Sequence, residues 1–221
     1  MQRYHKIQSI FYRDPETKYK TFIEGKFTDP SFGILQNVPW DFSEKIDGTN
    51  IRIGWNGYNV RLAGRSDNAE LPGQLRIYLE EYFTDDLLCS IFQGAEGVTL
   101  IGEGYGGKIQ KMGKIYGDDQ RFILFDVFVE PNENNPLGIW LERDAVTDIA
   151  CQLGIPCVPV IFTNTLLVGY LKLKEHPDYK SLVSQTGAPL EGFVARPQVE
   201  LRNKFGGRII TKIKGKDFIS V

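Results

Sequence analysis

The sequence lacks the features of secreted, membrane-spanning and zinc-binding proteins. It has no run of about 18 apolar residues, and its first twenty residues lack the apolar centre of a signal peptide. Its three cysteines form no C-x-x-C pair, and its two histidines, His5 and His176, lie far apart. These absences argue against a disulfide framework and against a zinc site. We therefore expect a cytoplasmic protein that does not associate with membranes.

Internal repeats, low-complexity tracts and linkers are also missing from the 221 residues. With 42% hydrophobic and 24% charged residues, the chain falls in the ordinary globular range and can bury one sizeable core. We expect a single domain over residues 1–221, present as a monomer.

The hydrophobic pattern is mixed and predicts an α+β fold of antiparallel β-sheets flanked by helices. Helical spacing of apolar residues covers 74–92 and 140–153, the second ending at Gly154. The predicted strands do not alternate regularly with helices, which argues against a doubly wound parallel sheet. These strands are rich in β-branched and aromatic residues and cover 51–55, 58–63, 98–103, 122–129, 157–162, 190–195 and 208–213.

The pair Asn56-Gly57 stands between two of these strands and is typical of a two-residue hairpin turn. In that register Trp55 faces Tyr58, and Gly48 faces Arg65. The hairpin would thus bring Arg65 close to the segment SEKIDGTNIRIGW, which contains Lys45.

Positive charge concentrates at residues 201–216, LRNKFGGRIITKIKGK, which hold six lysines or arginines and no acid. Lys212 and Lys214 are two apart on a predicted strand and so share one face. Two ammonium groups on one face could hold a triphosphate and lower the pKa of a third lysine, which would make that amine reactive. They could equally form an ordinary solvated strand face.

Two glutamates stand at strand ends beside glycine. Glu191 opens the strand LEGFVA, where Gly192 would leave room for the close approach of a ligand. Glu103 ends the strand VTLIGE and precedes three glycines in four residues. An isolated glutamate at a strand end is usually only exposed, but a reaction on a nucleoside triphosphate needs carboxylates to orient a divalent cation.

The ordered motifs KIDGTN (45–50), LAGRSD around Arg65, GEGYGGKIQ around Glu103, FILFDVFV, EGFVARP and TKIKGKDF resemble those of the covalent nucleotidyltransferases. These enzymes are the ATP-dependent polynucleotide ligases and the mRNA capping enzymes. The similarity is greatest to the RNA ligase 2 group of phage and related RNA ligases, and it runs from about residue 4 to 218. It implies a nucleotidyltransferase, ATP-grasp-like domain.

The resemblance implies a role for each matching residue. Lys45 would attack the α-phosphorus of ATP to form a lysyl-AMP, with Mg²⁺ or Mn²⁺ as the metal. For the nucleoside, it implies that Glu44 lies near the adenine, that Phe125 stacks on it and that Glu103 contacts the ribose hydroxyls. Asn50 and Arg65 would contact the nucleotide or the RNA end. Phosphates would be contacted by Lys212, Lys214 and, more weakly, Arg196, and the metal by Glu191.

The same resemblance implies that AMP passes to a 5′-phosphate RNA end, which is then sealed to a 3′-hydroxyl. Residues 201–216 and Lys108, Lys111 and Lys114 are the natural basic surface for RNA ends or a nicked duplex. The three lysines could instead belong to a solvated loop.

Single positions bear on the choice between RNA and DNA. Asn50 favours the RNA ligase 2 group, since DNA ligases and capping enzymes carry arginine there, whereas Asp47 is typical of the latter two. A minimal DNA ligase or a capping-type guanylyltransferase is therefore the alternative enzyme. A noncatalytic module that binds nucleotide or RNA is the alternative outside catalysis.

The chain departs from the family pattern at its end, because Val221 follows Lys214 by only seven residues. We therefore expect no C-terminal OB-fold or helical domain, and nick recognition by the nucleotidyltransferase domain or by a separate RNA-binding partner. A compact ligase of this kind would suit a virus or phage, acting in the cytoplasm of the host cell.

Overall fold

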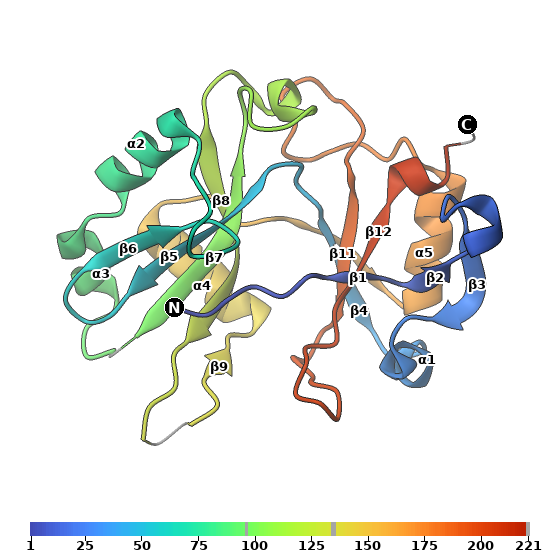
Figure 1. Ribbon diagram of the computed structural model, residues 1–221, viewed down its shortest axis with the longest axis horizontal. Helices are drawn as coiled ribbons and strands as arrows, with labels where there is room; N and C mark the ends of the chain where they lie inside the picture. The colour runs from blue at the N-terminus through green and yellow to red at the C-terminus, as the bar shows by residue number, and fades with distance from the viewer. Residues whose placement is uncertain (96, 134–135, 220–221) are drawn as a thin grey trace. The chain divides into compact units, whose positions relative to one another are not determined.

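The computed structural model of the protein describes residues 1–95, 97–133 and 136–219. The chain divides into two compact units. Unit 1 comprises Met1–His5 and Asp47–Val158, and unit 2 comprises Lys6–Ile46 and Pro159–Val221. Each unit has its own sheet (Figure 1). Each also has its own hydrophobic core. The expectation of a single domain stays a prediction.

Unit 1 is built on a five-stranded antiparallel sheet with the strand order β6-β5-β7-β8-β9. Its strands are β5 (Thr49–Trp55), β6 (Val60–Ala63), β7 (Val98–Tyr105), β8 (Arg121–Val129) and β9 (Ile139–Trp140). A bulge at Phe125 shifts the register, because Ile101 pairs with Asp126 while Gly102 pairs with Leu124.

Three helices cover one face of this sheet, namely α2 (Gly73–Tyr82), α3 (Asp85–Ile91) and α4 (Arg143–Leu153). Every second residue of a strand points to the same face, so Ile51 and Ile53 of β5 both reach the core beneath the helices. Gly154 ends α4 in the left-handed conformation with φ 66°, as its position in the sequence predicts.

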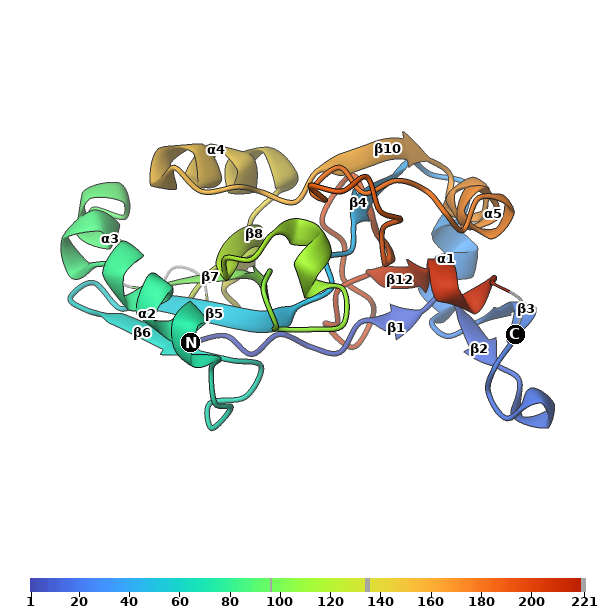
Figure 2. The same ribbon diagram turned by 90° about the horizontal axis from the view of Figure 1, so that it is seen from above.

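The N-terminal segment crosses the other face of the sheet, opposite α4 (Figure 2). The backbone N–H of Gln2 donates to Thr99 Oγ1 at 3.2 Å, and the Tyr4 hydroxyl donates to Asp126 at 2.7 Å. Arg52 is fully buried here and donates to the Gly64 carbonyl at 2.7 Å and to Asp67 at 2.8 Å. This polar packing fixes the face on which Asn50 and Glu103 lie.

Unit 2 has a second five-stranded sheet with the order β1-β12-β11-β4-β10. Its strands are β1 (Gln8–Ser9), β4 (Trp40–Glu44), β10 (Val160–Asn164), β11 (Gly192–Pro197) and β12 (Thr211–Lys214). Only the pair of β1 with β12 is parallel among the described strands. A separate hairpin joins β2 (Phe11–Arg13) to β3 (Phe22–Phe27).

The core of unit 2 lies on one face of this sheet, against α1 (Pro30–Leu35), α5 (Leu166–Glu175) and the β2–β3 hairpin. Phe42, Phe193 and Ile213 point into it from three adjacent strands, and all three are fully buried. Their neighbours Ser43, Val194 and Lys212 therefore point to the opposite face. Within the described part of the chain, short 3-10 helices lie at Pro15–Thr17, Gly113–Tyr116 and Gly215–Asp217.

The predicted α+β class with antiparallel sheets is confirmed. The predicted helix over 74–92 is two helices, because Thr84 caps α3 by accepting a hydrogen bond from the N–H of Leu87 at 3.2 Å, and Asp85 and Asp86 occupy its first turn. The sequence pattern did not predict α1, α5, β1 to β4 or β9, most of which are short.

The predicted register of the β5–β6 hairpin is wrong by two residues. Trp55 pairs with Val60, and the loop has four residues instead of two. The side chain of Asn56 accepts hydrogen bonds from the N–H groups of Tyr58 and Asn59 at 3.0 and 2.9 Å, which closes a longer turn. Consequently Gly48 does not face Arg65.

Among the described residues, no helix has the length and apolar character needed to span a bilayer.

Gly169 of α5 packs directly on the buried ring of Phe42. A Cβ atom added there would lie 2.0 Å from Phe42 Cζ. We expect Gly169→Ala to lower the free energy of unfolding by about 1–3 kcal/mol through overpacking, as measured by chemical denaturation.

Gly73→Ala is the matched control, because it also changes a helical glycine but meets open space. It should leave stability unchanged or raise it by up to about 1 kcal/mol. Equal stability of the Gly169→Ala variant and the parent would contradict the packing described for unit 2.

Candidate functional site

Lys45 directly follows β4 and is held in line with the sheet of unit 2. Its backbone N–H donates to the Gly192 carbonyl at 2.9 Å, and the N–H of Glu44 donates to the Pro159 carbonyl at 3.0 Å. Because Glu44 pairs with Phe193, Lys45 lies beside Gly192 on the sheet face opposite the core. Lys214 pairs with Gly192 from the other side.

Glu191 joins the two lysines. Its Oε2 lies 2.5 Å from Lys45 Nζ, and its Oε1 lies 2.6 Å from Lys214 Nζ. All three side chains are less than a quarter exposed, at 23% for Lys45, 22% for Lys214 and 11% for Glu191. Two charge-assisted hydrogen bonds in a partly buried place hold both amines firmly. We call Lys45, Glu191 and Lys214 the ionic triad.

Gly192 is required for a reason other than the predicted one. A Cβ atom there would lie 2.1 Å from the carbonyl oxygen of Ile213 and 2.8 Å from the α-carbon of Lys214. The space beside Gly192 is thus filled by β12, and the expectation that it leaves room for a ligand is wrong. The glycine permits close pairing of β11 with β12, and this pairing brings Lys214 to Glu191.

The charges of the ionic triad affect ionisation nearby. Burial opposes the ionisation of Glu191, but Lys45 and Lys214 outweigh it and hold the pKa of Glu191 below its usual range. Lys212 lies on the same face, two residues before Lys214. Its burial, together with the charges of Lys214, Lys45 and Lys6, lowers the pKa of Lys212 from 10.5 to about 8.

A metal ion would have to rely on few protein ligands. Within residues 1–95, 97–133 and 136–219, no group of three or more histidines, cysteines or acids could hold one. Mg²⁺ typically binds one or two carboxylates and takes its other ligands from water and substrate phosphates. The single ionised carboxylate of Glu191, next to lysines suited to phosphate, fits such an ion.

Glu44 and Arg196 lie outside the ionic triad. The Glu44 carboxylate is buried on the core face, where it accepts hydrogen bonds from Ser181 Oγ at 2.5 Å and from the N–H of Leu182 at 2.8 Å. Arg196 lies four residues along β11 from Gly192, about 13 Å at the usual strand rise, and 3.9 Å from Glu200. Contacts of Glu44 with adenine and of Arg196 with phosphate stay predictions.

In unit 1, Asn50 and Glu103 face each other across β5 and β7. The side-chain oxygen of Asn50 is buried and accepts no hydrogen bond from the described residues. Gly48 permits this arrangement, since a Cβ there would lie 2.2 Å from the Gly104 carbonyl and 2.7 Å from Glu103 Cγ. The structure thus pairs two predicted ligand-binding residues and leaves one of them with an unused acceptor.

Phe125 and Arg65 occupy less regular positions in unit 1. Phe125 is the bulged residue of β8, half-buried, and its ring lies 5.1 Å from the ring of Tyr4. Arg65 is exposed in the loop after β6, next to Gly64, which packs near the Asn50 carbonyl. Arg65 therefore neighbours Asn50 along the sheet edge and does not oppose Gly48.

Asp47 ties the KIDG motif to the loop between β7 and β8. Its carboxylate accepts a hydrogen bond from the N–H of Met112 at 3.2 Å, and its own N–H donates to the Tyr116 hydroxyl at 3.2 Å. The same loop exposes three of the lysines that the sequence suggests for RNA, Lys108, Lys111 and Lys114.

Several residues that shape the surroundings of the predicted site residues have no signal in the sequence. Ser181 holds Glu44 across 137 residues of sequence, and no local pattern reveals such a contact. Lys6 contributes to the charge around Lys212 from a segment with no recognisable motif. Arg52 carries no motif in the sequence, and its burial is explained by its hydrogen bonds to the Gly64 carbonyl and to Asp67.

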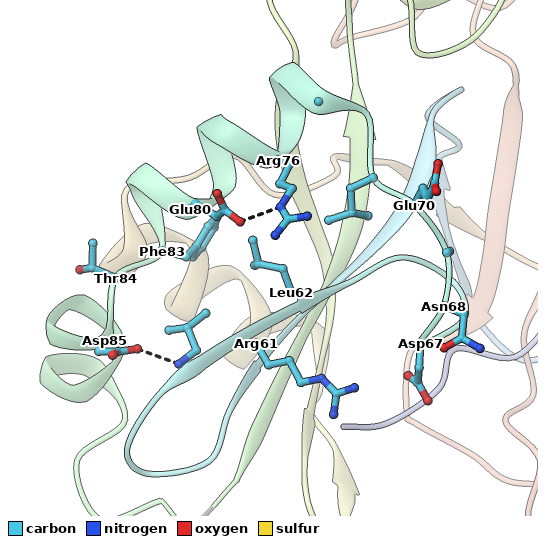
Figure 3. A pocket seen from close by; sticks show the side chains of 14 residues that line it. Arg61, Leu62, Asp67, Asn68, Glu70, Arg76, Glu80, Phe83, Thr84 and Asp85 are labelled. Carbon is cyan, nitrogen blue, oxygen red and sulfur yellow. Dashed lines mark hydrogen bonds and ion pairs between the residues drawn. The ribbon is translucent and has the colours of Figure 1, made fainter.

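Unit 1 also has a surface pocket of about 940 Å³ beside β6 and α2 (Figure 3). Arg76 and Glu80 form an ion pair in it at 2.7 Å, and Asp85 accepts a hydrogen bond from the N–H of Val60 at 2.7 Å. None of the predicted site residues is among the described residues that line it.

Comparison with known proteins identifies one family and one group of related folds. Residues 38–214 match the RNA ligase family. No curated protein matches the chain. Among solved structures, a mutant of Naegleria gruberi RNA ligase with AMP and Mn shares 14% identity at a TM-score of 0.67, over 97% of this chain and 56% of that one.

Two further structures of the Naegleria gruberi enzyme agree. The one with pyrophosphate has 15% identity and a TM-score of 0.65, over 97% of this chain and 56% of that one. A mutant with ATP and Mn has 17% identity and a TM-score of 0.63, over 84% of this chain and 52% of that one. The chain thus spans about half the length of these ligases and shares their fold. From the match over most of its length, the chain belongs to the RNA ligase family.

Proposed function

We propose that this protein is an ATP-dependent RNA ligase that works through a covalent AMP on Lys45. The observation that carries the proposal is the ionic triad, in which the lysine of the KIDG motif lies beside a second lysine around one carboxylate. An amine that attacks a polyphosphate needs positive charge for the leaving group and a site that positions it. Both are available on this face of unit 2.

In the first step the Lys45 amine attacks the α-phosphorus of ATP. A nitrogen–phosphorus bond forms, the bond from the α-phosphorus to the bridging oxygen of the β-phosphate breaks, and pyrophosphate leaves. The amine gives up one proton to water in the process. The contact of Lys45 with Glu191 must be released before the attack, because the amine nitrogen has to reach the α-phosphorus.

The next two steps need no further protein nucleophile. A 5′-phosphate oxygen of RNA attacks the AMP phosphorus, breaks its bond to Lys45 and returns the amine. A 3′-hydroxyl then gives up its proton to water and attacks the activated 5′-phosphorus, which forms the phosphodiester and releases AMP. Each bond formed between phosphorus and an oxygen or nitrogen is balanced by one that breaks.

The neighbouring residues have roles that follow from their charge. Lys212 and Lys214 would bind the phosphates of ATP, and Glu191 would hold Mg²⁺ or Mn²⁺ directly or through water. When bound, such an ion neutralises the charge that develops on pyrophosphate. Arg196 is a weaker candidate for a phosphate contact.

Unit 1 would supply contacts to the nucleoside and the RNA end. Glu103 would accept hydrogen bonds from the ribose hydroxyls, and Phe125 would stack on adenine, where Tyr4 now provides an aromatic neighbour. Asn50 and Arg65 would contact the nucleotide or the RNA end, and Glu44 would lie near the base. The unused acceptor of Asn50 supports its part in this set.

The family match and the structures of Naegleria gruberi RNA ligase with ATP, AMP, Mn and pyrophosphate support this chemistry. RNA ends or nicked duplexes would be the substrates, with nick recognition by the nucleotidyltransferase domain or by a separate RNA-binding partner. We also expect the monomeric state and cytoplasmic location that the sequence suggested.

Removal of the nucleophile provides the first test. We expect Lys45→Ala and Lys45→Arg to lower transfer of label from α-labelled ATP to the protein by at least about a hundredfold, because no other amine replaces it. Lys174→Ala is the control, since Lys174 also pairs with a glutamate, Glu24, at 2.6 Å. Undiminished labelling of the Lys45 variants would show that another residue is the nucleophile, and labelling by GTP alone would favour a guanylyltransferase.

The pKa of Lys212, lowered to about 8, predicts a pH dependence for ATP binding. Above pH 8 the Lys212 amine loses its proton and its attraction for phosphate, so ATP affinity should fall by up to about tenfold per pH unit. Lys212→Arg keeps its charge over this range and should bind ATP with little change up to about pH 9.5. Titration calorimetry measures both. An equal decline in the two proteins would contradict the role of Lys212.

The proposed preference for RNA is tested with matched nicks that carry a 3′-ribose or a 3′-deoxyribose. We expect the ribose nick to be sealed about tenfold faster or more, because a 2′-hydroxyl can donate to a buried acceptor that is otherwise unpaired. Asn50→Ala should reduce this ratio. Equal sealing of both nicks by the parent protein would favour a DNA ligase.

A further inference from the structure

The long loop that joins β11 to β12 in unit 2 forms a closed hairpin tip (Figure 1). The N–H of Ile209 donates to the Leu201 carbonyl at 3.0 Å, and the N–H of Asn203 donates to the Gly207 carbonyl at 2.7 Å. Between these two hydrogen bonds, the backbones of Arg202 and Arg208 pair in an isolated antiparallel β-bridge. The tip therefore has a defined backbone although it lies beyond the sheet.

Asn203 fixes the end of the tip. Its side-chain oxygen accepts hydrogen bonds from the N–H groups of Phe205 and Gly207, each at 3.0 Å, and its side-chain nitrogen donates to Asp29 at 2.9 Å. Asp29 is itself anchored, because it caps α1 by accepting from the N–H of Ser31 at 2.8 Å. The conformation of residues 203–207 is thus tied to the body of unit 2.

This ordered tip presents an aromatic ring and positive charge to solvent. Phe205 is 84% exposed, and the Lys204 ammonium lies 5.0 Å from the centre of its ring. Arg202 is exposed as well, and residues 201–207 include no acid. Two acids close to the tip have partners of their own, since Glu200 pairs with Arg208 at 2.6 Å and Asp29 accepts from Asn203.

The basic segment 201–216 therefore separates into two parts. Lys212 and Lys214 belong to the strand face with the ionic triad, and Arg208 is buried against Glu200. Only the part around Lys204 and Phe205 combines cations with an exposed ring. An exposed phenylalanine is unfavourable in water unless a partner covers it, and the charge around this one selects an anionic partner.

We propose that Phe205 and Lys204 form an RNA-binding tip, on which one unpaired base of the RNA strand stacks against the Phe205 ring while Lys204 contacts an adjacent phosphate. Aromatic stacking combined with a cation is the usual mode for single-stranded nucleic acids, because every base has a flat face and every link a charge. The fixed backbone of the tip lowers the entropy lost on binding. This inference rests on the proposed function, since it takes RNA as the substrate.

The test is binding of a fluorescent single-stranded oligoribonucleotide, measured by anisotropy at several salt concentrations. We expect Phe205→Ala to weaken binding about tenfold, and Phe205→Trp to bind as well as the parent or better. Lys204→Gln should lower the slope of log affinity against log salt by about 0.7, the loss of one phosphate contact.

An oligomer of the same length built from abasic units separates stacking from charge. With this probe the Phe205→Ala effect should disappear while the Lys204→Gln effect remains. Tyr58→Ala is the matched control, because Tyr58 is also 84% exposed but stands among asparagine and glycine. It should leave RNA binding unchanged.

Labelling of the protein by ATP alone should be the same in the Phe205 variants and the parent, and this separates the two proposals. Absence of labelling in the parent protein would refute the proposed function, whereas the RNA-binding measurements would still test the tip proposal. Unchanged RNA affinity of Phe205→Ala would overturn the tip proposal. A change only in self-association, detected by sedimentation, would overturn it in favour of a protein contact.

Discussion

The structure around Lys45 depends on one buried carboxylate between two ammonium groups. Burial would raise the pKa of Glu191, but contacts with Lys45 and Lys214 lower it below its usual range and keep the carboxylate ionised. Those contacts in turn require three chain segments in fixed register, with Gly192 in the middle and no side chain to separate them. The hydrophobic core on the reverse of the sheet supplies that register, so packing on one face determines the electrostatics of the other.

This arrangement would keep the proposed nucleophile in place before its substrate arrives. The carboxylate balances the lysines and limits their mutual repulsion, which would otherwise destabilise the fold. The balance is incomplete at Lys212, whose lowered pKa reflects burial and three neighbouring cations. A polyanion such as ATP would complete it, and the protein would therefore gain stability on binding. Such local charge excess is common where a protein trades stability for binding.

The sequence allowed the α+β class, most strands of unit 1 and the central residues of the ionic triad to be predicted. It did so because strand alternation places Lys212 and Lys214 on one face and ordered motifs mark Lys45 and Glu191. Long-range contacts such as Ser181 with Glu44 have no local signature, and the Asn56 side chain lengthened a turn that the Asn-Gly pair had suggested to be short. The Gly192 error has the same origin, because sequence cannot tell whether a glycine admits a ligand or a neighbouring strand.

The central claim is that Lys45 alone accepts AMP. Its most direct test is peptide mapping by mass spectrometry after the parent protein has been incubated with ATP and Mn²⁺ at neutral pH, where the phosphoramidate is preserved. The account predicts one AMP group, located on the peptide that contains Lys45, with the peptides of Lys212 and Lys214 unmodified. An adduct on another residue, or an unmodified Lys45 in a folded protein that binds ATP, would contradict it.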